Sequence, residues 1–439
     1  MLDPLNLPGW MVTHWEQNAY DYRLTIRSLA PSATCPHCGH ARLARHGVLA
    51  PGFRDVPMHG KRVGLIVQRQ RYRCLQCRRT FVDAIPGLDD HHRVTERLKI
   101  FVAEQVLSRP FTAVATEVGL DEKTIRAVFR AAVQTWDQKR HVVTPTMLGI
   151  DEVVLGQPRC VLTNVDAQTL LDMLPNRTYD TVFAYLQQMP QSQRVQWVTM
   201  DMWRPYRVAV TRALPQATIV IDKFHVVRMA NAALDSVRKQ IGTTLSPRER
   251  RTLLHDRFLL LKRAQDLAPM DQMVLEAWTK NLPLLGSAYR AKEAFFAIYD
   301  SRSRGEAEDR YREWENALPG DLQTAFSPLM TAMNNWHAQI LAYFDRPITN
   351  AYTESVNNLI RAMQRMGRGY SFEVLRAKML YTAGMQRSDI PRYGTKPFEP
   401  VLSDMMRQHR INGLPTPDRT MVAGRLLGSD LAKLLSLLS

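Results

Sequence analysis

"MLGIDEVVLGQPRCVLTNVDAQTLLDMLPNR", residues 147–177, is the stretch that decides the fold. Its segments "MLGIDEVVL", "RCVLTNVDA" and "TLLDMLPNR" are short, apolar and bounded by turn residues, a pattern that predicts three successive strands. A helix is expected at residues 179–189, followed by the strand "RVQWVTMD", a short helix and the strand "ATIVID". This order predicts an α/β core.

A long helical stretch, residues 224–345, follows the predicted sheet and contains "RERRTLLHDRFLLLKRA" and "MTAMNNWHAQILAYF". One more helix is expected in "ITNAYTESVNNLIRAMQRMGRGYS", residues 348–371. Strands first and a helical block late predict a sheet domain that an all-α insertion interrupts.

The last of these helices has two distinct faces. Apolar side chains at helical spacing predict a buried stripe, made of Tyr352, Val356, Leu359, Ile360 and Met363. The opposite face carries polar side chains suited to phosphates around a metal, namely Glu354, Asn357, Asn358, Arg361 and Arg365. A solvated face with helix pairs worth roughly 0.2–0.5 kcal/mol each remains the alternative.

Two further acids stand in apolar strands. Asp151 lies within the first strand and Asp201 ends the fourth, where a buried carboxylate is costly unless a cation holds it. In a ribonuclease H-like fold these strands are neighbours, so both acids can converge with Glu354. Three such acids can hold two Mg²⁺ ions for an in-line phosphoryl transfer.

Other acids compete for these places. Glu152 should point to the opposite sheet face, while Asp166 and Asp172 lie on strands interpreted as outer. Asp222 is the serious rival to Asp201, because it also ends an apolar strand. We expect Asp222 and His225 to support the metal ligands or to contact DNA.

Composition points to an acidic polymer as the partner. The chain has 439 residues, enough for two to four domains, and a formal net charge of +16. The segment from Arg42 to Lys99 contains thirteen Lys or Arg and five Asp or Glu, so it holds half of that net charge. A DNA-contacting amino-terminal region is therefore predicted, with a merely basic soluble surface as the alternative.

The cysteines predict one structural zinc. Two Cys-x-x-Cys pairs, "CPHC" and "CLQC", place two thiolates each at adjacent corners of a tetrahedral site, as in a zinc ribbon. The expected ligands are Cys35, Cys38, Cys74 and Cys77. His37, His40 and His46 lie near and are alternative ligands, and the two close pairs favour a metal site over a secreted disulfide scaffold.

A helix-turn-helix is predicted in "FTAVATEVGLDEKTIRAVFRAAVQTW", residues 111–136. Ala115, Gly119 and Ile125 supply the small residue, the positive φ of the turn and the apolar anchor of the second helix. That helix would present its outward side chains to a major groove, and these are Lys123, Thr124, Arg126 and Arg130. Three-helix packing without DNA is the alternative.

Taken in order, the cysteine pairs, the helix-turn-helix, "GIDE", "DMWRPY", "DKFHVV" and "NAYTESVNNLIR" resemble the DDE transposases of bacterial insertion sequences, most closely the ISL-three (ISL3) family. The resemblance implies a ribonuclease H-like core with Asp151, Asp201 and Glu354 as the catalytic triad, and two Mg²⁺ that Mn²⁺ can replace. It also implies binding of the element's terminal inverted repeats, cleavage at its ends and joining of the freed 3′ hydroxyls to target DNA. One departure is Arg78 after Cys77, where the first pair has Gly39, which leaves the second turn's geometry open.

These expectations divide the chain into five parts. They are a zinc ribbon at residues 1–90, a helix-turn-helix domain at 91–141, core parts at 142–225 and 346–439, and an all-α insertion at 226–345. The start shows no signal peptide and no stretch is apolar enough to span a membrane, so a cytoplasmic, nucleoid-associated protein acting as a homodimer on DNA is expected. A silent DNA-binding regulator derived from a transposase and a host nuclease acting on RNA–DNA hybrids remain alternative functions.

Overall fold

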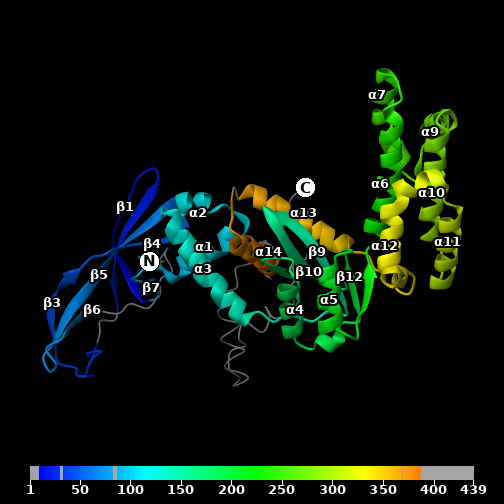
Figure 1. Ribbon diagram of the computed structural model, residues 1–439. Coiled ribbons are helices and arrows are strands. Elements are labelled where there is room, and N and C mark those ends of the chain that lie inside the picture. The colour runs from blue at the N-terminus through cyan, green and yellow to red at the C-terminus, as the bar shows by residue number, and fades with distance from the viewer. Residues whose placement is uncertain (1–8, 30–32, 83–86, 368, 387–439) are drawn as a thin grey trace, which may run out of the picture. The chain divides into compact units, whose positions relative to one another are not determined.

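The computed structural model describes residues 9–29, 33–82, 87–367 and 369–386 of the chain (Figure 1). The chain divides into two compact units, and the boundary along the chain falls between His141 and Val142. Among the described residues, no helix is both long and apolar enough to cross a membrane. The C-terminal segment "GRLLGSDLAKLLSLLS" has apolar residues at helical spacing, which favour a helix packed on its own core over an interface helix, and it lies outside the described residues.

The first unit combines a sheet with three helices. Its strands are β1 (Trp10–Gln17), β2 (Asp21–Ser28), β3 (Leu43–Leu49), β4 (Gly52–Met58), β5 (Lys61–Cys74), β6 (Thr80–Val82), β7 (Leu88–Asp89) and β8 (Val94–Thr95). The long strand β5 pairs with β2, β3, β4 and β6, and β4 continues to β8 and β7. Alternate residues of β2 and β5, including Leu24, Ile26, Val63 and Leu65, bury one sheet face in a small apolar core.

The three helices of this unit are α1 (Glu96–Ser108), α2 (Phe111–Val118) and α3 (Glu122–Lys139). A buried carboxylate joins the start of α1 to the sheet: Asp55 of β4 accepts hydrogen bonds from Thr95 Oγ1 (2.7 Å) and Arg97 Nε (2.8 Å). Thr95 in turn caps α1 by accepting from the backbone N–H of Leu98. The predicted ribbon and helix-turn-helix therefore form one unit.

The second unit contains a five-stranded sheet in the order β11-β10-β9-β12-β13. Its strands are β9 (Met147–Leu155), β10 (Gln157–Asn164), β11 (Thr169–Leu174), β12 (Trp197–Met200) and β13 (Thr218–Ile221), with α4 (Tyr179–Gln188) and α5 (Arg204–Ala213) between them. The first three strands pair antiparallel, and β12 pairs parallel with β9 and β13. Each of these strands and helices was predicted from the sequence.

Strand alternation divides the faces of this sheet. Leu148 and Ile150 of β9 join a core with Val182 of α4 and Tyr206 of α5. Intervening residues, including Gly149 and Asp151, face α13 (Ala351–Met366), which crosses the opposite face of the sheet (Figure 1). The sheet thus lies between two helical layers.

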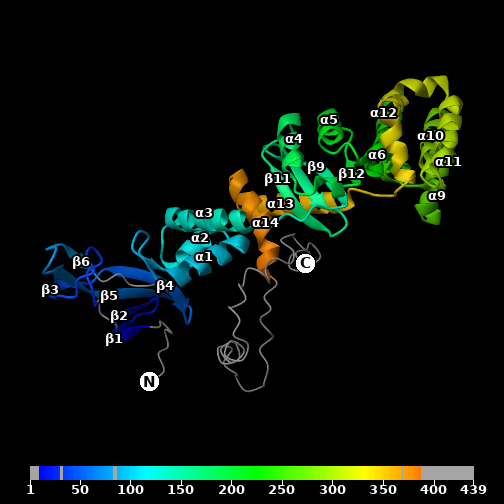
Figure 2. The same ribbon diagram turned by 90° about the horizontal axis from the view of Figure 1, so that it is seen from below.

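The chain between β13 and α13 is helical wherever it is regular. Its helices are α6 (Lys223–Gly242), α7 (Pro247–His255), α8 (Arg257–Leu261), α9 (Pro269–Asn281), α10 (Pro283–Ile298), α11 (Arg304–Ala317) and α12 (Gln323–Leu341), and Figure 2 shows α10 and α12 beside α6. Lys292 of α10 is fully buried, and its ammonium group donates to the carbonyl oxygens of Leu260 (3.0 Å) and Lys262 (2.6 Å) at the end of α8. After α13, helix α14 (Phe372–Gln386) ends the described chain.

Candidate functional site

Two predicted acids come together where β9 and β12 lie side by side. Met200 is in register with Ile150, so Asp201 and Asp151 follow at neighbouring positions. Asp151 is 7% exposed, and the side chain of Asp201 is 25% exposed. Burial, followed by the negative charge of Asp201, raises the pKa of Asp151 to about 8. The two carboxylates are thus close enough to repel each other, and a cation would relieve that repulsion.

Asp222 and His225 border this pair. Asp222 is buried at the start of α6, where its carboxylate caps the helix by accepting from the N–H of Phe224 (3.2 Å). His225 Nδ1 lies 3.0 Å from Asp201 Oδ1 and 3.6 Å from Asp222 Oδ2. Burial lowers the pKa of His225, but hydrogen bonding to Asp201 and then Asp222 outweighs it and raises that pKa to about 10. His225 is therefore an imidazolium that links the two aspartates.

Helix α13 is tied to Asp151. The side-chain amide of Asn357 donates to Asp151 Oδ2 (2.8 Å) and to the carbonyl oxygen of Glu152 (3.1 Å). Asn357 is 1% exposed, which departs from the expected DNA-facing position. Glu354 precedes Asn357 by three residues, and residues at that spacing are neighbours on a helix surface. The exposed Glu354 therefore lies about one turn from the contact with Asp151.

A buried polar cluster, which the sequence did not reveal, holds α13 against the sheet. Thr353 Oγ1 lies 2.7 Å from Thr163 Oγ1 of β10 and donates to Asn350 Oδ1 at 2.6 Å. Asn350 Nδ2 donates to the carbonyl oxygen of Ile150 at 3.1 Å. A Cβ atom at Gly149 would lie 2.4 Å from Thr163 Oγ1 and 2.5 Å from Thr353 Oγ1, so only glycine fits there. The sequence signal for this cluster is the spacing of Asn350, Thr353 and Asn357 at i, i+3 and i+7, which places three polar side chains on one face of a helix.

The remaining side chains of α13 match the predicted faces more closely. Val356, Leu359 and Ile360 are buried, while Tyr352 and Met363 are half-buried. Asn358 and Arg365 are exposed, and Arg361 donates to Asn358 Oδ1 at 2.9 Å.

The competing acids have structural partners. Glu152 forms an ion pair with Arg177, whose guanidinium lies over the Trp203 ring. Asp172, on the edge strand β11, receives two hydrogen bonds from Arg376 (2.6 and 2.9 Å). Asp166 accepts from the N–H of Met147 (2.8 Å) just beyond β10. None of these three contacts involves Asp151 or Asp201.

The four cysteines form a site with the dimensions of a tetrahedral zinc centre. Cys35 Sγ lies 3.7 Å from Cys77 Sγ, and Cys38 Sγ lies 3.6 Å from Cys74 Sγ. A tetrahedron with Zn–S bonds of about 2.3 Å has edges of about 3.8 Å. Among the described residues, this is the one group of three or more His, Cys, Asp or Glu whose ligand atoms all lie within 4.8 Å of one another. The predicted histidine alternatives do not belong to it.

The two cysteine turns share one geometry. The N–H of Cys35 donates to His40 O (3.0 Å), and the N–H of Cys74 donates to Arg79 O (2.9 Å). Gly39 has a φ of 72° and Arg78 a φ of 60°, so an arginine occupies the left-handed conformation that glycine takes in the first turn. The second cysteine turn therefore keeps the geometry of the first, although Arg78 stands where the first turn has Gly39. Backbone N–H groups, that of Cys77 first, also lower the pKa of the Cys74 thiol to about 7.

The helix-turn-helix has the predicted anatomy. Gly119 ends α2 with a φ of 72°, Asp121 caps α3 by accepting from the N–H of Thr124 (2.8 Å), and Ile125 is fully buried. Lys123 and Arg130 are exposed. Arg126 pairs with Glu122 and lies over the Phe111 ring (4.4 Å), so part of its charge is already engaged.

Comparison with known proteins assigns a family to each part. Family models match residues 31–77 (zinc-finger of the IS204, IS1001, IS1096 and IS1165 transposases), residues 84–133 (helix-turn-helix domain of transposase family ISL3) and residues 148–379 (transposase, ISL3 DDE type). The chain is 25% identical over 354 residues to the transposase for insertion sequence element IS1001 of Bordetella parapertussis, covering 79% of this chain and 87% of that protein. It is 24% identical over 416 residues to the transposases for insertion sequence element IS1557 of two Mycobacterium tuberculosis strains, covering 86% of this chain and 92% of each of those proteins.

Proposed function

The chain belongs to the ISL3 family of transposases, and on that premise we propose that it binds the terminal inverted repeats of its element and catalyses DNA cleavage and strand transfer. Asp151, Asp201 and Glu354 are the proposed catalytic acids. The observation that carries the proposal is the pairing of β9 with β12, which puts Asp151 beside Asp201, together with the Asn357 contact that fixes the helix of Glu354 to Asp151. Asp222 lies one strand further away and is already engaged as a helix cap.

The donor set suits magnesium. Asp201 Oδ1 is buried 3.0 Å from His225 Nδ1, and the Asp201 carboxylate faces a second carboxylate in Asp151. Oxygen ligands of this kind are those that Mg²⁺ or Mn²⁺ prefers. Two bound ions would activate an attacking hydroxyl and stabilise the leaving oxygen. His225 holds the Asp201 carboxylate, and Asn357 holds that of Asp151.

The proposal also assigns a role to each part of the fold. We assign the five-stranded sheet with α4, α5 and α13 to a ribonuclease H-like core, and the helices α6 to α12 to an all-α insertion. The cysteine site holds one structural zinc, and α3 enters a major groove with Lys123 and Arg130 toward the DNA. Because joining two ends requires two active sites, the acting form is a homodimer on DNA.

The test is excision of a marked cassette flanked by the element's inverted repeats. Wild-type protein should excise it, whereas Glu354→Gln and Asp201→Asn should not, although both still bind the ends. Glu276→Gln, which neutralises an exposed acid of α9, is the matched control and should excise normally. Wild-type protein that binds but never excises would support the regulator instead, and excision by Asp201→Asn would move the site to Asp222.

A further inference from the structure

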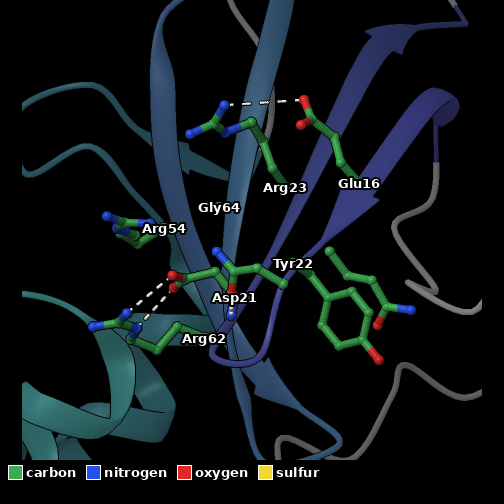
Figure 3. A pocket seen from close by; sticks show the side chains of 9 residues that line it. Glu16, Asp21, Tyr22, Arg23, Arg54, Arg62 and Gly64 are labelled. Carbon is green, nitrogen blue, oxygen red and sulfur yellow. Dashed lines mark hydrogen bonds and ion pairs between the residues drawn. The ribbon is translucent and has the colours of Figure 1, made fainter.

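A polar hollow of about 330 Å³ opens on the sheet of the first unit (Figure 3). Its walls come from β1, β2, β4 and β5 and from the turn between β1 and β2. The side chains that matter for its chemistry are Glu16, Asp21, Arg23, Arg54 and Arg62. Neither the zinc site nor the helix-turn-helix accounts for this concentration of arginines.

The strand register builds the hollow around one glycine. Arg23 of β2 and Arg54 of β4 both lie opposite Gly64 of β5, on either side of it. A Cβ atom at Gly64 would lie 3.1 Å from Arg54 Nη1, so the missing side chain makes room for the guanidinium. We call Arg23, Arg54 and Arg62 around Gly64 the arginine trough.

The three guanidiniums differ in how far they are neutralised. Arg62 forms two hydrogen bonds with the Asp21 carboxylate (2.7 and 2.9 Å), which lower the pKa of Asp21. Arg23 has a single contact of 3.9 Å with Glu16, and both side chains are more than half exposed. The backbone N–H of Arg54 donates to Arg93 O (2.9 Å), but its guanidinium has no hydrogen bond or ion pair with any residue that the structure describes. Two positive charges therefore remain available to an anion.

The trough lies against the turn of the helix-turn-helix. A Cβ atom at Gly119 would lie 3.0 Å from Arg62 Cδ and 3.8 Å from Arg54 Cζ. A second hollow of about 400 Å³ shares Arg23, Arg54 and Gly64 with the first and reaches Arg93 and Leu120. Leu120 directly precedes the cap residue of α3, so the trough adjoins the end of α3 that carries Lys123.

We propose that the arginine trough binds a backbone phosphate of the DNA duplex whose groove α3 enters. Planar guanidiniums match phosphate oxygens in pairs, and Arg23 and Arg54 flank an open space of suitable charge. This role rests on the proposed function, because it assumes end binding through α3. The phosphate contact does not depend on the base sequence of the DNA. The arginine trough positions the protein on the duplex, while α3 reads the bases.

The experiment measures binding of the full-length zinc-loaded protein to an end-repeat duplex and to an unrelated duplex over a range of salt concentrations. Arg54→Gln should weaken binding to both about tenfold and reduce the slope of log K against log salt by about 0.9, the value for one lost phosphate contact. Arg54→Lys should restore most of the slope. Arg73→Gln removes the same charge from an exposed position of β5 outside the trough, and it should change binding much less.

Two further variants guard against misfolding. Arg23→Gln should repeat the loss, and Gly64→Asp should exceed it by placing a carboxylate between the arginines, with zinc content and melting profile compared throughout. If Arg54→Gln and Arg23→Gln lose no more than Arg73→Gln while wild-type protein binds the ends, the trough proposal is overturned and the proposed function stands. If wild-type protein does not prefer the end repeat at all, both proposals fail.

Discussion

Gly149→Ala tests whether the polar cluster beneath α13 positions the candidate site. The added methyl group would lie 2.4 Å from Thr163 Oγ1 and 2.5 Å from Thr353 Oγ1, which is about 1 Å short of an ordinary carbon–oxygen contact. Neither hydroxyl can turn away freely, because the two are hydrogen-bonded to each other and Thr353 also donates to Asn350. Helix α13 must therefore move away from β9 or lose these bonds.

These contacts set how much Gly149→Ala should lower the free energy of unfolding. Overpacking costs about 1–3 kcal/mol, and leaving one or two buried polar groups unpaired adds about 1–3 kcal/mol each. With one such group left unpaired, we expect the free energy of unfolding of the second unit to fall by roughly 2–6 kcal/mol. Excision should fall further than end binding, since the displaced helix carries Glu354 and Asn357.

The assay is denaturant unfolding of the full chain followed by tryptophan fluorescence, combined with excision and end binding. Gly305→Ala is the matched control, because a Cβ atom there meets nothing within 4 Å and alanine favours the helix α11. It should leave stability unchanged or slightly higher. A Gly149→Ala protein as stable and active as the wild type would refute the argument that α13 is held by close polar packing.

Three further predictions concern other parts of the chain. Lys378 is fully buried, and burial lowers its pKa from 10.5 to about 7. Between these two pH values the unfolded chain holds a proton on Lys378 that the folded chain has lost. The free energy of unfolding should therefore rise with pH from about 7 to about 10.5. Lys378→Met should remove this rise and, at pH 7, stabilise the protein by about 2–4 kcal/mol, as pH-dependent unfolding would show; an unchanged pH profile would contradict it. Arg78→Gly should stabilise the second cysteine turn by about 1 kcal/mol, because glycine takes a φ of 60° without strain; equal or lower melting temperature would contradict this. Cys74→Ser or chelation of zinc should abolish end binding and lower the first melting transition, measured by calorimetry with metal analysis; full binding by metal-free protein would show that the site is dispensable.

The sequence predicted the regular elements well where one physical signal dominated. Short apolar segments gave β9 to β13, and Gly119 with Asp121 gave the turn of the helix-turn-helix. The paired Cys-x-x-Cys spacing gave the four-cysteine cluster, because two local turns supply all its ligands. In each case the signal is local in sequence, although the two cysteine turns that it predicts meet across 36 and 42 residues.

Contacts between distant segments could not be predicted in the same way. The sheet of the first unit begins before the cysteine pairs, because β1 pairs with β2 and β2 pairs with β5, and the alternation of Leu24 and Ile26 is the sequence signal for this. Asn357 looked like a surface residue because amides usually are. Its burial depends on Asp151 and the Glu152 carbonyl, which no periodicity connects with α13.

The contact between Asn357 and Asp151 spans 206 residues, and this fixes the order in which the molecule can be completed during synthesis. At about 5–20 residues per second, a ribosome exposes α13 some 10–40 s after β9. Throughout that interval the nascent chain already holds its zinc-binding turns and its helix-turn-helix, yet Asp151 lacks its amide partner. A transcript interrupted before α13 would therefore yield a protein with both amino-terminal modules and no assembled carboxylate site.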